Sequence, residues 1–215
     1  MDISTKKVCF LGDSITEGVG ASVYAETSYV GLFKNRYPDA KIFNYGVGGT
    51  RIAKQIVPSV CERHDRDFIS RVDDMEENAD FVGVFGGTND YGHGDAPFGV
   101  FGDKTENTFC GAVYALFEKL LVKYPLATIA VFTPLHRLAE EVPSANSGKT
   151  LSEYVEIIKK TAELFSFPVL DLWSVSGINP KFGKVQETMM PDGLHPNDTG
   201  YRRLFERMDG FIKTL

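Results

Sequence analysis

Three side chains of this sequence have the types and spacing of a nucleophilic site. Ser14 follows an apolar run at residues 8–11, and Asp192 and His195 stand three positions apart. A serine hydroxyl becomes a nucleophile when a base takes its proton and an acid orients that base. In a single turn, the carboxylate of Asp192 would accept from Nδ1 of His195, leaving Nε2 for the proton of Ser14. Alone, the Asp–His pair would equally suit a helix cap; with Ser14 it predicts acyl transfer.

Two further residues could stabilise the oxyanion that such an attack creates. Gly49 ends the glycine-rich stretch 44–49, and its N–H can approach a substrate oxygen because no side chain intervenes. Asn89 follows an apolar run at residues 80–85 and carries a side-chain amide donor. Each residue by itself is more often an ordinary loop or turn residue. Their assignment depends on the fold bringing them beside Ser14.

Strand and helix patterns alternate along the chain. Short apolar strands are expected at residues 8–11, 41–44, 80–85, 127–132 and 168–172. Helices are expected at residues 26–36, 51–63, 109–124, 151–165 and 198–212, with loops at 88–107 and 133–149 and an irregular segment at 173–197. The alternation predicts an α/β protein with a five-stranded parallel sheet in a three-layer α/β/α sandwich, flavodoxin-like in form. Ligands bind at the carboxyl edge of such sheets, where Ser14, Gly49 and Asn89 should meet.

Length and charge limit the classes of function. The 215 residues fit one domain, 1–215. The 23 basic and 29 acidic residues give a net charge of −6, which argues against nucleic acid or an anionic lipid surface as a partner. Neither a signal-peptide pattern nor a membrane-spanning apolar stretch is visible, so a cytoplasmic protein without membrane insertion is expected. Nothing indicates an oligomer, and the expected partner is a small-molecule ester.

The sequence predicts neither a cofactor nor a metal. It has no Walker-type loop and no Gly-x-Gly-x-x-Gly loop to hold a phosphate. Asp90 and His93 could form half of a metal site, but no neighbouring ligand completes it. The cysteines are three in number and widely spaced, which does not suggest a disulfide framework. Cys9 and Cys110 are instead expected to be buried free thiols.

Four motifs, spread from residue 8 to residue 196, resemble in order and spacing the four sequence blocks of the SGNH, or GDSL-type, hydrolases. They are Gly12-Asp13-Ser14, Gly49, Gly87-Thr88-Asn89-Asp90 and Asp192-x-x-His195. The resemblance implies the SGNH-hydrolase fold and ester hydrolysis by a catalytic triad of Ser14, Asp192 and His195. It also implies an oxyanion hole formed by the N–H groups of Ser14 and Gly49 and the amide of Asn89.

Other readings of the same site remain open at the level of sequence. Ile15 stands where the family name has leucine, an apolar exchange of little expected effect. The Gly-x-Ser-x-Gly elbow of the α/β-hydrolases is absent, which disfavours that family. A thioesterase or a lysophospholipase-type acylhydrolase would use the same residues. A carbohydrate-binding domain without turnover is a further alternative, and the stretch 46–49 gives weak support to a flavodoxin-like nucleotide binder.

Several side chains are candidates for binding the substrate. They are Asp13 beside the nucleophile, Asp90, Tyr91 and His93 after the third strand, and His136 and Arg137 after the fourth. Aromatic rings mixed with carboxylates in the segment 88–107 suit a sugar, although the rings would equally anchor that segment to the domain. Arg137 could bind an anionic group or be a surface charge. No long amphipathic lid is visible, so we expect a small acyl group, such as acetyl on a carbohydrate.

Overall fold

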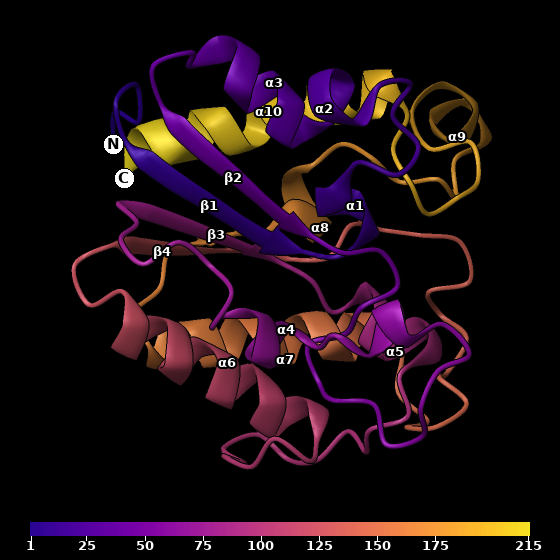
Figure 1. The fold of residues 1–215 in the computed structure, drawn as a ribbon. Coiled ribbons are helices and arrows are strands. Elements are labelled where there is room, and N and C mark those ends of the chain that lie inside the picture. Colours follow the sequence, from indigo (N-terminus) through magenta and orange to yellow (C-terminus); the bar gives the residue numbers. More distant parts are fainter.

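The computed structural model describes all residues, 1–215, and is built on a five-stranded parallel sheet (Figure 1). Its strands are β1 (Lys7–Gly12), β2 (Lys41–Gly46), β3 (Phe81–Phe85), β4 (Thr128–Phe132) and β5 (Val169–Leu170). They lie in the order β2-β1-β3-β4-β5, and every neighbouring pair is parallel. This is the strand order of flavodoxin-like sheets, which place ligands at the switch point between β1 and β3. The predicted fold class is therefore confirmed.

Helices cover both faces of the sheet, so that the molecule has three layers (Figure 1). The longer ones are α3 (Tyr29–Arg36), α6 (Phe109–Lys123), α7 (Leu151–Leu164) and α10 (Asp198–Thr214). The short ones are α1 (Ser14–Glu17), α2 (Tyr24–Thr27), α4 (Phe68–Arg71), α5 (Thr88–His93), α8 (Leu172–Val175), α9 (Gly183–Met189) and the 3₁₀ turn η1 (Glu62–Asp65). None of these helices combines the length and apolar character needed to cross a bilayer.

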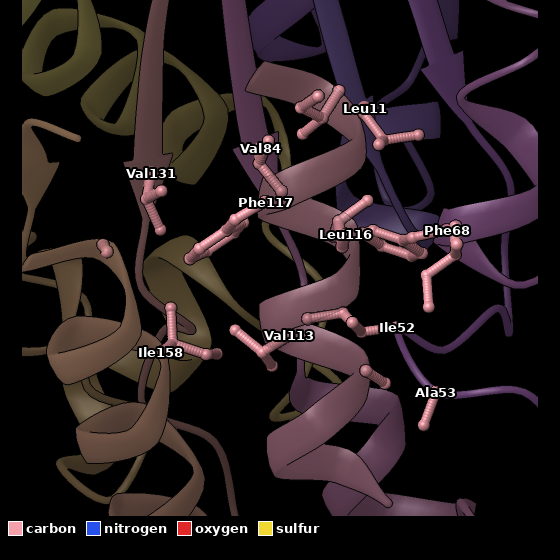
Figure 2. Packing of buried hydrophobic residues seen from close by; sticks show 14 of the residues in the cluster. Leu11, Ile52, Ala53, Phe68, Val84, Val113, Leu116, Phe117, Val131 and Ile158 are labelled. Atoms are coloured by element: carbon pink, nitrogen blue, oxygen red, sulfur yellow. The ribbon is translucent and has the colours of Figure 1, made fainter. Parts of the chain in front are cut away.

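Alternate residues of the central strands enter two separate cores. Cys9 and Leu11 of β1 pack on the side of α4, α6 and α7, whereas Val8 and Phe10 pack on the side of α3 and α10. In Figure 2, Phe117 of α6 lies among apolar side chains from both the sheet and α7. Burial of both faces explains why the strands read as continuous apolar runs in the sequence. Cys9 and Cys110 are buried free thiols, as predicted, and Cys61 is exposed.

The helix predicted at residues 51–63 is wrong. The segment is irregular until η1, because carboxylates from beyond β3 take its backbone N–H groups. Asp90 accepts from residues 52 and 53 at 3.0 and 2.9 Å, and Asp95 accepts from residues 56 and 57 at 2.8 and 2.7 Å. Pro58 also lacks the N–H that a helix interior requires. Long-range side-chain acceptors here replace the local ladder of a helix.

Two segments expected to be irregular contain short helices. The segment 88–107 begins with α5, which follows Gly87 at a φ of 108°. The segment 173–197 contains α9, which has no buried residue and therefore no apolar stripe to reveal it in the sequence. The fifth strand is also shorter than expected, with Val169 and Leu170 alone in the ladder.

Candidate active site

A tight turn at the end of β1 positions Ser14. A Cβ atom added to Gly12 would lie 1.9 Å from Oγ1 of Thr16, so only glycine permits this close exit from the strand. Asp13 then caps α1, accepting the N–H of Ile15 at 3.0 Å. Ser14 is the first residue of that helix and is 7% exposed. Its hydroxyl therefore stands on a rigid element just beyond the carboxyl edge of the sheet.

The structure brings Ser14, His195 and Asp192 into one hydrogen-bonded chain. Nε2 of His195 lies 2.9 Å from Oγ of Ser14, and Nδ1 lies 2.7 Å from Oδ2 of Asp192. The other carboxylate oxygen accepts the N–H groups of Leu194 and His195, at 2.9 and 2.7 Å. The single turn predicted across residues 192–195 is thus present. A proton on Nδ1 leaves Nε2 as the acceptor that faces the serine.

Asp192 stays ionised although it is close to the protein interior. Partial burial would raise its pKa, but hydrogen bonds from the backbone N–H and ring of His195, and from Leu194, outweigh burial and lower it. The side chain is 55% exposed, so water also solvates the charge. At neutral pH a carboxylate therefore faces the imidazole and would favour the imidazolium that forms when a serine proton is taken.

Three hydrogen-bond donors line the cleft beside the serine hydroxyl. The backbone N–H groups of Ser14 and Gly49 donate to no acceptor within the protein. Asn89 uses its Nδ2 group to donate to the carbonyl of Thr50 at 2.9 Å, which fixes the amide and leaves its second hydrogen free. Gly49 has a φ of 76°, and a Cβ there would overlap the ring of His64. The position therefore requires glycine.

The cleft itself has a volume of about 400 Å³ and a polar lining. Val19 and Leu194 are its only hydrophobic lining residues. Of the residues proposed from the sequence, it brings together Ser14, Gly49, Asn89, His93, Arg137 and His195. Asp192 lies behind the imidazole and reaches the cleft only through it. Such a lining suits a small polar ligand better than a long hydrocarbon chain.

Four of the expected substrate-binding side chains do not line this cleft. Asp13 is the cap of α1, and burial raises its pKa to about 6. Asp90 is occupied by backbone N–H groups of the 51–63 segment, and burial raises its pKa to about 6 as well. Tyr91 donates its hydroxyl to the carbonyl groups of residues 139 and 142. These three side chains support the walls of the site.

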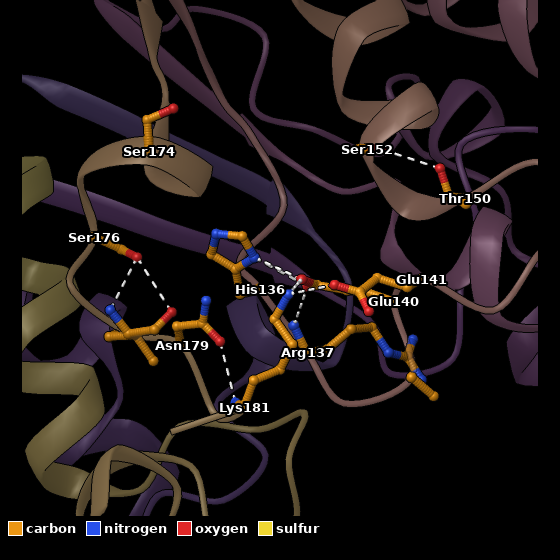
Figure 3. Close-up of polar contacts among 12 residues, drawn as sticks. His136, Arg137, Glu140, Glu141, Thr150, Ser152, Ser174, Ser176, Asn179 and Lys181 are labelled. Atoms are coloured by element: carbon orange, nitrogen blue, oxygen red, sulfur yellow. Dashed lines mark hydrogen bonds and ion pairs between the residues drawn. The ribbon is translucent and has the colours of Figure 1, made fainter. Parts of the chain in front are cut away.

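His136, the fourth, is not among the lining residues. It belongs to a separate polar cluster (Figure 3). Its ring stacks on Trp173 with centroids 3.9 Å apart, and its Nδ1 lies 2.9 Å from the buried carboxylate of Glu140. The same carboxylate accepts the backbone N–H of Arg137 at 2.9 Å and pairs with Lys181 at 2.7 Å. The expectation that His136 and Arg137 face the site together is therefore wrong for His136.

Sequence reasoning missed three ionisable residues that line the cleft, Glu17, Arg63 and His64. Glu17 stands in the same helix as the nucleophile, and its carboxylate accepts the N–H of Gly48 at 2.7 Å. It also pairs with Arg63. Arg63 is the last residue of the wrongly predicted helix 51–63 and His64 follows it directly, and nothing in the sequence distinguished either one. Their positions follow from the Asp90 and Asp95 contacts that shape that segment.

Asp90 and His93 do not form the half-site for a metal that their spacing allowed. Asp90 faces backbone N–H groups, whereas Nδ1 of His93 lies 3.0 Å from Nη1 of Arg51. No group of three or more His, Cys, Asp or Glu side chains is clustered as metal ligands would be. The donor chemistry of the cleft is instead that of N–H groups converging beside a hydroxyl.

A parallel sheet of this strand order, with a serine and a histidine in contact at its carboxyl edge, is the architecture of the SGNH-hydrolase class of α/β proteins. The model of the GDSL-like lipase/acylhydrolase family matches residues 10–203. The chain belongs to this family, whose members are ester hydrolases, and the resemblance seen in the four motifs is confirmed. No curated protein sequence matches the chain.

Solved structures show the same fold over nearly the whole chain. A protein from Lactobacillus plantarum is 27% identical with a TM-score of 0.83, and the match covers 99% of each chain. A carbohydrate acetylesterase family member from Sinorhizobium meliloti is 18% identical with a TM-score of 0.65, covering 97% of this chain and 98% of the other. A two-domain esterase active on acetylated mannans is 22% identical with a TM-score of 0.61, covering 97% of this chain and 48% of the other.

Proposed function

We propose that this protein is a serine ester hydrolase that works through an acyl-enzyme on Ser14. The observation that carries the proposal is the hydrogen-bonded chain in which His195 connects Ser14 at 2.9 Å with Asp192 at 2.7 Å. A nucleophile, a base and an orienting acid in contact are the parts that such a mechanism needs. A carbohydrate-binding domain without turnover does not need a serine, a histidine and an aspartate in hydrogen-bond contact. We therefore favour an enzyme.

The reaction would proceed in two displacements. Oγ of Ser14 attacks the acyl carbon while Nε2 of His195 takes its proton, and the carbonyl π electrons move onto oxygen. The N–H groups of Ser14 and Gly49 and the amide of Asn89 would stabilise that oxyanion. The oxyanion then collapses, the bond from carbon to the alcohol oxygen breaks, and the imidazolium protonates the leaving alcohol. Water, deprotonated by His195, attacks the acyl-serine in the same way and releases the acid and the free serine.

The lining of the cleft supports a small acyl group on a polar alcohol. Only two of its 13 lining residues are hydrophobic, so it offers no apolar channel for a long chain. One protein of the same fold is a carbohydrate acetylesterase family member, and another is an esterase active on acetylated mannans. These points favour an acetylated carbohydrate over the substrates of a thioesterase or a lysophospholipase-type enzyme.

The test is hydrolysis by wild type and Ser14→Ala across a panel of esters. The panel contains p-nitrophenyl esters of increasing acyl length, acetylated sugars and acetyl thioesters. We expect the highest kcat/KM for acetyl esters and a loss of several orders of magnitude in kcat in the variant. Ser22→Ala, an exposed serine, is the matched control. Full activity of Ser14→Ala would refute the mechanism, and a preference for long acyl chains would refute the substrate class.

A further inference from the structure

The cleft is rich in cationic and imidazole side chains although the chain has a net charge of −6. Arg63, His64, His93, Arg137 and His195 line it, and Glu17 is its single carboxylate. Arg63 is paired with that carboxylate. The buried Arg51, which lies behind the cleft, is paired with Asp65 at 3.1 Å. Arg137 differs from both because no carboxylate pairs with its guanidinium.

The contacts of Arg137 leave most of its donors unused. Nη1 donates to the carbonyl and to Oγ1 of Thr88, both at 3.3 Å. Nε is buried without an acceptor, and Nη2 donates to no protein group. Nε is enclosed by the protein, whereas Nη2 is not, so Nη2 is the donor that an incoming acceptor can reach. The planar fork of a guanidinium matches an oxyacid anion such as a carboxylate or a phosphate.

The surroundings hold Arg137 at the wall of the cleft. Glu140 accepts the backbone N–H of Arg137 but is itself occupied by His136 and Lys181 (Figure 3), so it does not neutralise the guanidinium. On the other side, a Cβ atom added to Gly92 would lie 2.9 Å from Nη1. The absence of a side chain at Gly92 therefore makes room for the guanidinium in the cleft that Ser14 and His195 also line.

Arg137 also lies between two clefts. Beyond it is a second hollow of about 280 Å³, and Gly92 and Arg137 line both this hollow and the catalytic cleft. Its other walls come from Tyr91 and from residues 138, 139 and 142–145. A ligand bound at Ser14 can therefore extend past the guanidinium. If the acyl group is as small as acetyl, the part that reaches Arg137 must belong to the alcohol.

His93 supplies a second donor on the same wall. The guanidinium of Arg51 has no acceptor atom, so Nδ1 of His93 accepts from it and the ring proton is on Nε2. Burial and then the positive charge of Arg51 lower the pKa of His93 from its ordinary value, so the ring is neutral at pH 7. The neutral ring keeps the N–H on Nε2 as a hydrogen-bond donor among the residues that line the cleft.

We propose that the substrate carries a carboxylate or a phosphate on its alcohol part and that Arg137, assisted by Nε2–H of His93, binds this group. The inference rests on the proposed function for the placement of the acyl carbon at Ser14. The alternative is that Arg137 has a structural role. Its Cζ lies over the Tyr91 ring, 5.6 Å from the ring centroid, and its Nη1 donates to the carbonyl of Thr88. A structural arginine would affect charged and neutral ligands alike, whereas an anion-binding arginine would separate them.

Binding to a protein that cannot turn over tests this directly. The anionic probes are the 2-, 3- and 4-acetoxybenzoates, whose carboxylates lie at different distances from the acetyl ester, and the corresponding acetoxyphenyl phosphates. The neutral partners are the methyl esters of the same acetoxybenzoates. Each is titrated into Ser14→Ala protein by NMR, alone and combined with Arg137→Ala, Arg137→Lys or the control Arg207→Ala. Arg207 is exposed on α10, and its removal changes the net charge by the same amount.

We expect at least one anionic isomer to bind more tightly than its neutral partner, and Arg137→Ala to weaken that isomer about 10- to 100-fold. The neutral ester and the Arg207→Ala control should change less than twofold, and Arg137→Lys should fall between. The isomers show at which distance from the ester the anion fits, and the comparison of benzoates with phosphates shows which anion fits better. Equal affinity for charged and neutral probes, or an equal loss for both in Arg137→Ala, overturns the inference. Because binding is measured without turnover, an inactive wild type would refute the proposed function alone.

Discussion

The carboxylate of Glu17 joins the helix that begins at Ser14 to the loop that holds Gly49, the proposed oxyanion donor. It accepts the N–H of Gly48 at 2.7 Å, and Gly49 follows directly in the chain. Arg63 pairs with the same carboxylate and brings the η1 turn to the cleft. Glu17 thus connects the helix of Ser14 to the loop after β2 that holds Gly49. We regard it as a positioning residue, because it acts on the reaction through Gly48.

Replacement of Glu17 should lower turnover more than substrate binding. Glu17→Ala frees the loop at residues 48–49, and misplacement of a donor by about 1 Å costs on the order of 10²-fold in rate. Glu17→Gln keeps an acceptor for the Gly48 N–H and should lose about tenfold or less in kcat. Steady-state kinetics with p-nitrophenyl acetate measure both, with Glu206→Gln on α10 as an exposed control. A change confined to KM would contradict the positioning role.

Asn89→Ala should remove one of the three proposed oxyanion donors. The loss of such a donor typically lowers kcat about 10²- to 10³-fold, because the contact strengthens as charge develops on oxygen. KM should change little. Asn78→Ala, at an exposed asparagine, controls for the loss of an amide. An Asn89→Ala enzyme with unchanged kcat would show that this amide does not contact the oxyanion.

Asp13 should make the folded protein less stable as pH rises from about 4 to about 6. Burial raises the pKa of this carboxyl from 3.8 to about 6. In that window the folded state holds a proton that the unfolded state has released, so the free energy of unfolding falls with increasing pH. Asp13→Asn keeps a side-chain oxygen for the N–H of Ile15 but removes the buried charge.

Urea unfolding of wild type and Asp13→Asn at pH 4 and pH 7 checks this linkage. The variant should gain stability relative to wild type at pH 7, by on the order of 2–3 kcal/mol more than at pH 4. Asp39→Asn, at an exposed aspartate, should show no such difference between the two pH values. A variant equally stable relative to wild type at both pH values would mean that Asp13 is not protonated in the fold at low pH.

The sequence predicted those parts of the site that depend on local signals. Ser14 and Asn89 follow apolar strands buried on both faces, and the parallel sheet places the ends of such strands at one edge. Asp192 and His195 meet within a single turn, so their spacing alone was sufficient. Each of these contacts needs only a strand end or a turn, and both leave a pattern in the sequence.

The parts that were missed depend on contacts between distant segments. Arg63 and His64 reach the cleft because Asp90 and Asp95 hold the segment before them in an irregular form. His136 does not line the cleft, because its ring packs against Trp173 and its Nδ1 contacts the carboxylate of Glu140. The local sequence does not predict which of two neighbouring side chains, such as His136 and Arg137, will line a cleft.

Mapping of covalent labelling by a fluorophosphonate probe tests the central claim most directly, because only an activated serine displaces the fluoride. Peptide mass spectrometry of the labelled wild-type protein should find the phosphonyl group on Ser14 and on no other residue. Labelling should be absent from Ser14→Ala and much slower in His195→Ala, while Ser22→Ala should react like wild type. An unlabelled wild-type protein, or a label on a different side chain, would contradict the account.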